Sequence, residues 1–151
     1  MKKFSLTDLL TSIIIAELVG TVSAVISGNF SVFYSQIIQP PFSPPAKVFP
    51  IVWTVLYMLM GISAYIIKTK KPDSLKIYII QLAVNFSWSI IFFRLKLFGL
   101  SAIVAIALFI LVGIMVIRFF KISKLASLLN VPYLLWSAFA SYLAVAICFL
   151  N

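Results

Sequence analysis

The sequence has no histidine and only one cysteine, Cys148. Histidine is the usual general base at neutral pH and the commonest protein ligand for metals and haem. A catalytic site with a histidine base and a metal or haem site with a histidine ligand are therefore both excluded. A single cysteine cannot form a disulfide within the chain or a zinc cluster. We therefore predict no metal site. Because Cys148 lies near the end of an apolar run, we interpret it as a packing residue.

Acidic side chains are also scarce, since Asp8, Glu17 and Asp73 are the only three in 151 residues. They fall on different segments, so no pair of carboxylates is placed for hydrolysis by general acid–base catalysis. The sequence contains neither a P-loop nor a glycine-rich dinucleotide motif. Glu17 interrupts an apolar run, where an ionisable side chain indicates either a functional group or a protonated or hydrogen-bonded structural residue.

Charged residues as a class make up only 10% of the chain, against 64% apolar residues, whereas soluble domains are about a quarter charged. The apolar residues form runs close to the roughly 20 residues that cross a bilayer. We predict an all-α integral membrane protein, a five-transmembrane-helix bundle in which residues 1–151 form a single domain. The expected spans are residues 7–27, 44–67, 74–93, 97–117 and 125–150, with a bend in the last near Pro132.

Basic residues predict how these spans are oriented. The side that holds the N-terminus carries nine of them: Lys2, Lys3, Lys68, Lys70, Lys71, Lys76, Arg118, Lys121 and Lys124. The opposite side carries three: Lys47, Arg94 and Lys96. Positive charge gathers on the cytoplasmic side of membrane proteins, so we expect a multi-pass protein of the cell membrane with a cytoplasmic N-terminus. We read the net charge of +9 as topology and not as a nucleic-acid-binding surface.

A proline-rich loop, residues 28–45, joins the first two expected spans. Four of its prolines fall within six residues: Pro40, Pro41, Pro44 and Pro45. Proline fixes φ and lacks an N–H, so this stretch is stiff and needs few backbone partners, which suits a lid over a site. We expect Ser43 to cap the following helix, with Pro44 or Pro45 in its first turn.

Polar and aromatic side chains share helical faces inside the spans. Gln81, Asn85 and Trp88 follow one another at helical spacing in the third span. The fifth span offers a matching face with Tyr133, Trp136 and Ala140. Such faces serve either as hydrogen-bonding contacts between helices or as the walls of a ligand pocket, and spacing alone leaves both interpretations open. The fourth span has only Gly113 to relieve its aliphatic surface between residues 102 and 117, so we assign it to lipid contact or a subunit interface.

Three segments of the chain resemble the signature segments of a known membrane family. They are residues 44–61, which contain Trp53 and Tyr57, residues 81–93, and residues 132–140. In order along nearly the whole chain, they are similar to the TspO/MBR family, also called tryptophan-rich sensory proteins, translocator proteins or peripheral-type benzodiazepine receptors, and in particular to its bacterial members.

This resemblance implies a membrane sensory or receptor protein, often a homodimer, that binds protoporphyrin IX in a pocket between helices under the first loop. Synthetic benzodiazepine-type and isoquinoline carboxamide ligands bind family members as well. The porphyrin would be a ligand or substrate, with no cofactor. The residues that match the family's pocket are Trp53, Tyr57, Asn85, Trp88, Trp136 and Ala140. We add Phe49, Gln81 and Lys47 to the predicted site, the last because its charge suits the propionates of a porphyrin.

Two other functions stay open. Some family members are described as degrading porphyrin with light and oxygen, which would make Trp53 and Trp136 catalytic. Transport of a porphyrin or a sterol ranks below this, because the sequence shows no inverted repeat. The loop departs from the family in having Phe42 and Lys47 where extra tryptophans are usual, and residues 143–151 lack the tyrosine and basic residue of the sterol motif.

Overall fold

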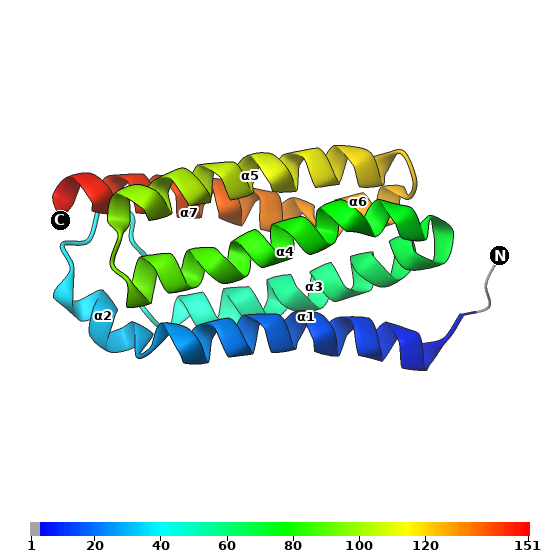
Figure 1. Ribbon diagram of the computed structural model, residues 1–151, viewed down its shortest axis with the longest axis horizontal. Helices are drawn as coiled ribbons and strands as arrows, with labels where there is room; N and C mark the ends of the chain where they lie inside the picture. The colour runs from blue at the N-terminus through cyan, green and yellow to red at the C-terminus, as the bar shows by residue number, and fades with distance from the viewer. Residues whose placement is uncertain (1–3) are drawn as a thin grey trace.

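The computed structural model describes residues 4–151, which form a bundle of long, roughly parallel and antiparallel helices with no β-strand among them (Figure 1). The long helices are α1 (Leu6–Ser27), α3 (Val48–Lys70), α4 (Lys76–Ser89), α5 (Phe98–Phe120) and α7 (Val131–Leu150). Shorter elements are α2 (Phe30–Gln36), a 3₁₀ helix (Pro72–Leu75), a π-helical turn (Ile90–Arg94) and α6 (Lys124–Leu128). With the short helices joined to their neighbours, residues 4–151 contain five segments long and apolar enough to cross a membrane. The predicted all-α membrane fold is confirmed.

The two ends of the bundle differ in charge. The start of α1 and the α3–α4 and α5–α6 connections lie at one end, whereas α2, the proline-rich loop and the C-terminus lie at the other, which we call the loop end (Figure 1). The first end holds Lys68, Lys70, Lys71, Lys76, Arg118, Lys121 and Lys124. The loop end holds Lys47, Arg94 and Lys96. Lys2 and Lys3 lie outside the described residues, and the cytoplasmic placement of the first end stays a prediction.

The second membrane span begins later than predicted. Helix α3 starts at Val48 and not at residue 44, and its N-cap residue, Lys47, forms no capping hydrogen bond through its side chain. The Ser43 hydroxyl instead donates to the carbonyl oxygen of Pro40 at 2.7 Å. This bond closes a turn in which Phe42 has a φ of 66°. The predicted cap at Ser43, with Pro44 or Pro45 in the first helical turn, is therefore wrong.

The proline-rich loop contains a helix that the sequence did not predict. Helix α2 is only seven residues long, too short to show a clear periodicity. Asn29 caps it, because its side-chain oxygen accepts a hydrogen bond from the N–H of Val32 at 3.2 Å. Phe33 is buried on the inner face of α2, at 5.4 Å between ring centroids from Phe92 in the π-helical turn. The first part of the loop is thus packed onto the bundle.

Two tyrosine hydroxyls hold the proline segment in place. Tyr34 of α2 donates to the carbonyl oxygen of Pro44 at 2.6 Å, and Tyr142 of α7 donates to that of Pro41 at 2.9 Å. Desolvation by burial raises the pKa of the Tyr34 hydroxyl. Because proline carbonyls remain acceptors although proline has no N–H, the segment is tied down through its oxygens.

The remaining spans agree with the prediction apart from their ends. The third reaches Arg94 through the π-helical turn, and α5 continues one turn beyond residue 117, to Phe120. The last span bends as expected near Pro132, where α6 ends at Leu128 and α7 begins at Val131. Helix α5 leaves a stripe of isoleucines exposed, in keeping with its assignment to lipid contact or a subunit interface: Ile103, Ile106, Ile110, Ile114 and Ile117.

Candidate ligand-binding cavity

A cavity of about 350 Å³ lies in the half of the bundle nearest the loop end. The second half of α1 forms one side with Glu17, Gly20, Thr21, Ser23, Ala24, Val25, Ser27 and Gly28. The remaining lining comes from α2, α3, the α4 span and α7: Phe30, Phe49, Pro50, Trp53, Thr54, Tyr57, Asn85, Trp88, Ser89, Phe93, Trp136 and Ala140. Phe30 of α2 reaches this space, whereas none of Pro40, Pro41, Pro44 and Pro45 lines it. The cavity therefore lies beneath α2 and not beneath the proline turn.

Polar atoms at the inner side of the cavity come from Tyr57 and Asn85, both buried. The Asn85 side-chain N–H donates to the Tyr57 hydroxyl at 3.0 Å, which joins α4 to α3. The Tyr57 ring lies directly against Gly20 of α1, where any Cβ atom would overlap its ring carbons. Glycine at this position lets the tyrosine fill the gap between α1 and α3.

Aromatic rings form the other walls. Trp53 lies 5.6 Å from Tyr57 between ring centroids, with the ring planes 32° apart. Trp136 of α7 meets Phe49 edge to face at 5.7 Å. Trp88 is fixed more tightly, because its indole N–H donates to the carbonyl oxygen of Ser101 at 3.0 Å. Although the three tryptophans of the chain come from three different spans, all line this cavity.

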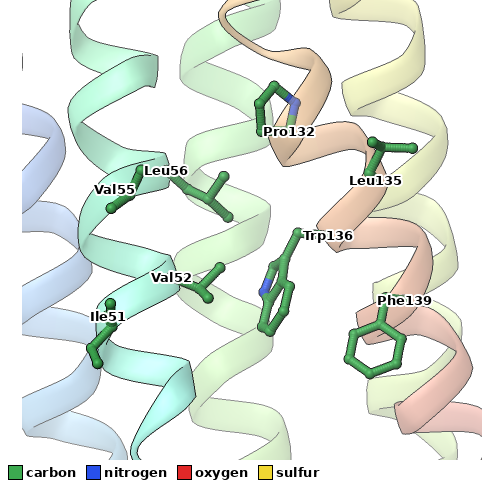
Figure 2. Close-up of a pocket in the computed structure, with 8 residues that line it drawn as sticks. All are labelled: Ile51, Val52, Val55, Leu56, Pro132, Leu135, Trp136 and Phe139. Carbon is green, nitrogen blue, oxygen red and sulfur yellow. The ribbon is translucent and has the colours of Figure 1, made fainter. Parts of the chain in front are cut away.

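Trp136 is also the wall between this cavity and a second space. An apolar crevice of about 480 Å³ lies between α3 and α7. In Figure 2, Trp136 extends from α7 toward Val52. The crevice is lined by Ile51, Val52, Val55, Leu56, Pro132, Leu135, Trp136 and Phe139. The Trp136 indole nitrogen is buried and has no hydrogen-bond partner among residues 4–151. Unlike the Trp88 indole, that of Trp136 has no acceptor for its N–H within the described residues.

The structure brings together seven of the nine residues that the sequence placed in the site: Phe49, Trp53, Tyr57, Asn85, Trp88, Trp136 and Ala140. Gln81 does not line the cavity. It is fully buried, accepts a hydrogen bond from the Tyr133 hydroxyl at 2.8 Å and approaches the sulfur of Met60 at 3.8 Å. This favours the interhelical interpretation of Gln81. Lys47 is exposed at the start of α3 and is also absent from the lining. Contact between any of these residues and a ligand stays a prediction.

Helix α1 contributes a wall that the sequence analysis missed. The sequence identifies Glu17 as an ionisable group within a span, but no sequence pattern assigned it to the binding site. Small residues at Gly20, Ala24 and Gly28 follow one another at i, i+4 and i+8, and all three line the cavity. This spacing is the signal that would have pointed to α1, because small residues on one helical face open room beside it.

The chemistry of the cavity is that of stacking and hydrogen bonding. No group of three or more histidine, cysteine, aspartate or glutamate side chains that could hold a metal occurs within residues 4–151. Glu17 is the only carboxylate among the lining residues, and no lysine or arginine lines the cavity. The arrangement suits a flat, largely apolar molecule with a few polar groups at its edge.

Comparison with known proteins agrees with this architecture. The model of the TspO/MBR family matches residues 12–150. A tryptophan-rich protein TspO of Chlorobaculum tepidum is 40% identical over 127 residues, which cover 79% of each chain. A TspO of the archaeon Archaeoglobus fulgidus is 37% identical over 91% of this chain and 98% of its own length. The human translocator protein is 30% identical over 74% of this chain and 70% of its own.

Proposed function

The chain belongs to the TspO/MBR family, and from this premise we propose that it is a membrane sensory or receptor protein that binds a porphyrin such as protoporphyrin IX. The proposed site is the cavity between α1, α3, α4 and α7. One observation carries the proposal: all three tryptophans of the chain, from three different spans, line a single cavity. Family membership supports the sensory or receptor role.

The walls of this cavity suit a porphyrin on physical grounds. The cavity volume, about 350 Å³, falls within the range of roughly 300–1,000 Å³ that ligand pockets occupy, but it is smaller than a whole protoporphyrin, so part of the macrocycle would lie outside the cavity. A flat macrocycle gains from stacking on the indoles of Trp53 and Trp136. The polar groups of Tyr57 and Asn85 offer hydrogen bonds to its edges, and the unpaired, buried N–H of Trp136 would offer another if the ring rotated toward the ligand.

The charges at the loop end support one orientation of the ligand. Lys47 is exposed there, close in sequence to the lining residue Phe49. A cation at the rim of a site mainly speeds the encounter with an anionic partner. We propose that the propionates enter last and stay near the loop end, so Lys47 steers association without lining the cavity. The synthetic ligands of the family would occupy the same space.

Assembly and orientation complete the proposal. A homodimer, as the family resemblance implies, would bury part of the apolar surface that the helices leave exposed. The isoleucine stripe of α5 is one such surface. The lipid bilayer covers the remainder, and the end that holds the start of α1 faces the cytoplasm because it carries most of the positive charge.

Ala140→Phe is the variant that tests where the ligand binds. Its side chain would project into the cavity from α7 and fill part of the space, so we expect porphyrin affinity to fall about tenfold or more, since overpacking typically costs about 1–3 kcal/mol. Ala138→Phe is the matched control, because Ala138 is exposed on the same helix and lies outside the cavity lining. Equal affinities for the two purified variants would place the porphyrin site elsewhere.

A further inference from the structure

Glu17 lies where a carboxylate is unusual. It is the twelfth residue of the 22-residue helix α1, so it sits near the middle of the membrane span. An ionisable side chain at this depth is costly unless another group compensates it. Glu17 lines the cavity and is the only carboxylate to do so. It therefore sets the electrostatic character of the inner part of the cavity.

The neighbouring polar groups are already engaged with one another. Thr54 donates to the carbonyl oxygen of Pro50 at 2.9 Å, and Ser23 donates to that of Phe86 at 3.1 Å. Of the other polar side chains in the lining, Asn85 bonds Tyr57, and the Ser27 and Ser89 hydroxyls bond each other at 2.7 Å. Thr21, one turn from Glu17 on α1, also lines the cavity. Within residues 4–151, none of these hydrogen bonds reaches Glu17, and the cavity lining holds no basic side chain. Glu17 thus has no hydrogen bond to its carboxylate among the described residues, and no basic side chain of the lining neutralises it.

We propose that Glu17 is the group by which the cavity recognises a positively charged or N–H-bearing nitrogen on a flat aromatic ligand. The nitrogen would sit beside Glu17 at the membrane centre, and the rings would stack on Trp53 and Trp136 nearer the loop end. An anionic substituent would gain no such partner beside Glu17 and would point toward the loop end. The same carboxylate would then orient a porphyrin with its propionates outward. This inference depends on the proposed function in one respect: the cavity must admit a flat ligand.

Three fluorescent probes with the same three-ring skeleton test this inference: aminoacridine, which is cationic, acridine, which is neutral, and anthracene carboxylate, which is anionic. Binding is measured at one neutral pH with the full chain in nanodiscs of zwitterionic lipid, so that the bilayer itself does not attract the cation. The wild-type protein should bind aminoacridine about tenfold more tightly than acridine, the size of effect that a charge-assisted hydrogen bond gives. Anthracene carboxylate should bind most weakly of the three.

Glu17→Gln keeps the size of the side chain but removes its charge, so aminoacridine and acridine should then bind equally well. Glu17→Asp should retain part of the preference. Asp8→Asn is the matched control, since it makes the same chemical change on α1 at a residue that does not line the cavity, and it should leave the preference intact.

Two results would overturn the inference: a wild-type protein that does not prefer aminoacridine, or a preference that survives Glu17→Gln. The first needs no variant, so the test does not depend on how a variant folds. Titration of the same nanodiscs with protoporphyrin IX separates the two proposals. If the wild-type protein does not bind porphyrin but prefers aminoacridine in a way that depends on Glu17, the porphyrin proposal is rejected and the role of Glu17 is kept.

Discussion

Gly61→Ala is expected to destabilise the protein by about 1–3 kcal/mol, a large effect for one methyl group. Gly61 is fully inside the contact between α3 and α1. A Cβ atom there would lie 2.5 Å from the Cα atom of Ile13 and 2.9 Å from the carbonyl oxygen of Ser12. Both are backbone atoms, which cannot rotate away as a flexible side chain can. The two helices must separate, and because α1 is one wall of the cavity, ligand affinity should fall too.

Gly113→Ala is the matched control for this prediction. The same methyl group on α5 would meet the Cδ1 atom of Leu134 at 3.7 Å, an ordinary van der Waals contact. Reversible unfolding in detergent, monitored by circular dichroism, gives the free energy of unfolding of each variant. Equal stabilities for Gly61→Ala and Gly113→Ala would show that α1 and α3 do not pack as described.

Replacing Trp53 and Trp136 together by alanine is expected to weaken protoporphyrin binding by a hundredfold or more. Each indole offers a large flat surface, and its loss costs about 2 kcal/mol in buried area and stacking. The sum corresponds to at least about a hundredfold in the dissociation constant, even if the two effects are not fully additive. Equilibrium titration in nanodiscs measures this change.

The double phenylalanine variant, Trp53→Phe with Trp136→Phe, is the control. Phenylalanine keeps much of the stacking surface, so most of the affinity should remain. The same pair also separates binding from degradation, because phenylalanine is much harder to oxidise than indole. Light-driven loss of porphyrin that occurs with the parent and stops with this variant would make the two tryptophans chemical participants. If the double alanine variant kept the parental affinity for porphyrin, neither tryptophan ring would belong to the binding site.

The parts of the fold that follow from the lengths of apolar runs were predictable. Five apolar runs, separated by islands of lysine and arginine, predicted five membrane-spanning segments, and the bend beside Pro132 was expected from its position. The start of α3 was not predictable, because Ser43 fits both a helix cap and a tight turn. The structure forms the turn because Phe42 adopts a left-handed backbone and because two tyrosine hydroxyls hold the segment. Tyr34 lies in α2 and Tyr142 lies far away in the sequence, in α7, so neither contact can be read from the residues around Ser43.

The candidate site was likewise predictable only in part. The aromatic residues on α3, α4 and α7 share faces that spacing reveals, and the structure places most of them around one cavity. Gln81 has the same spacing as Asn85, yet it turns to Tyr133 and Met60, and no pattern in the sequence distinguishes these two amides. The wall that α1 supplies was missed although the spacing of its small residues was a signal, because that spacing does not say which neighbour the face meets; the structure shows the Tyr57 ring against Gly20.

The central claim, that a porphyrin occupies the cavity, is tested most directly by quenching of tryptophan fluorescence in the wild-type protein. All three tryptophans line the cavity, so one bound protoporphyrin IX should quench nearly the whole emission. The account predicts that quenching saturates at one porphyrin per chain and does not change when the ratio of lipid to protein in the nanodiscs is varied. Quenching that instead follows the concentration of porphyrin in the lipid, without saturation, would contradict it.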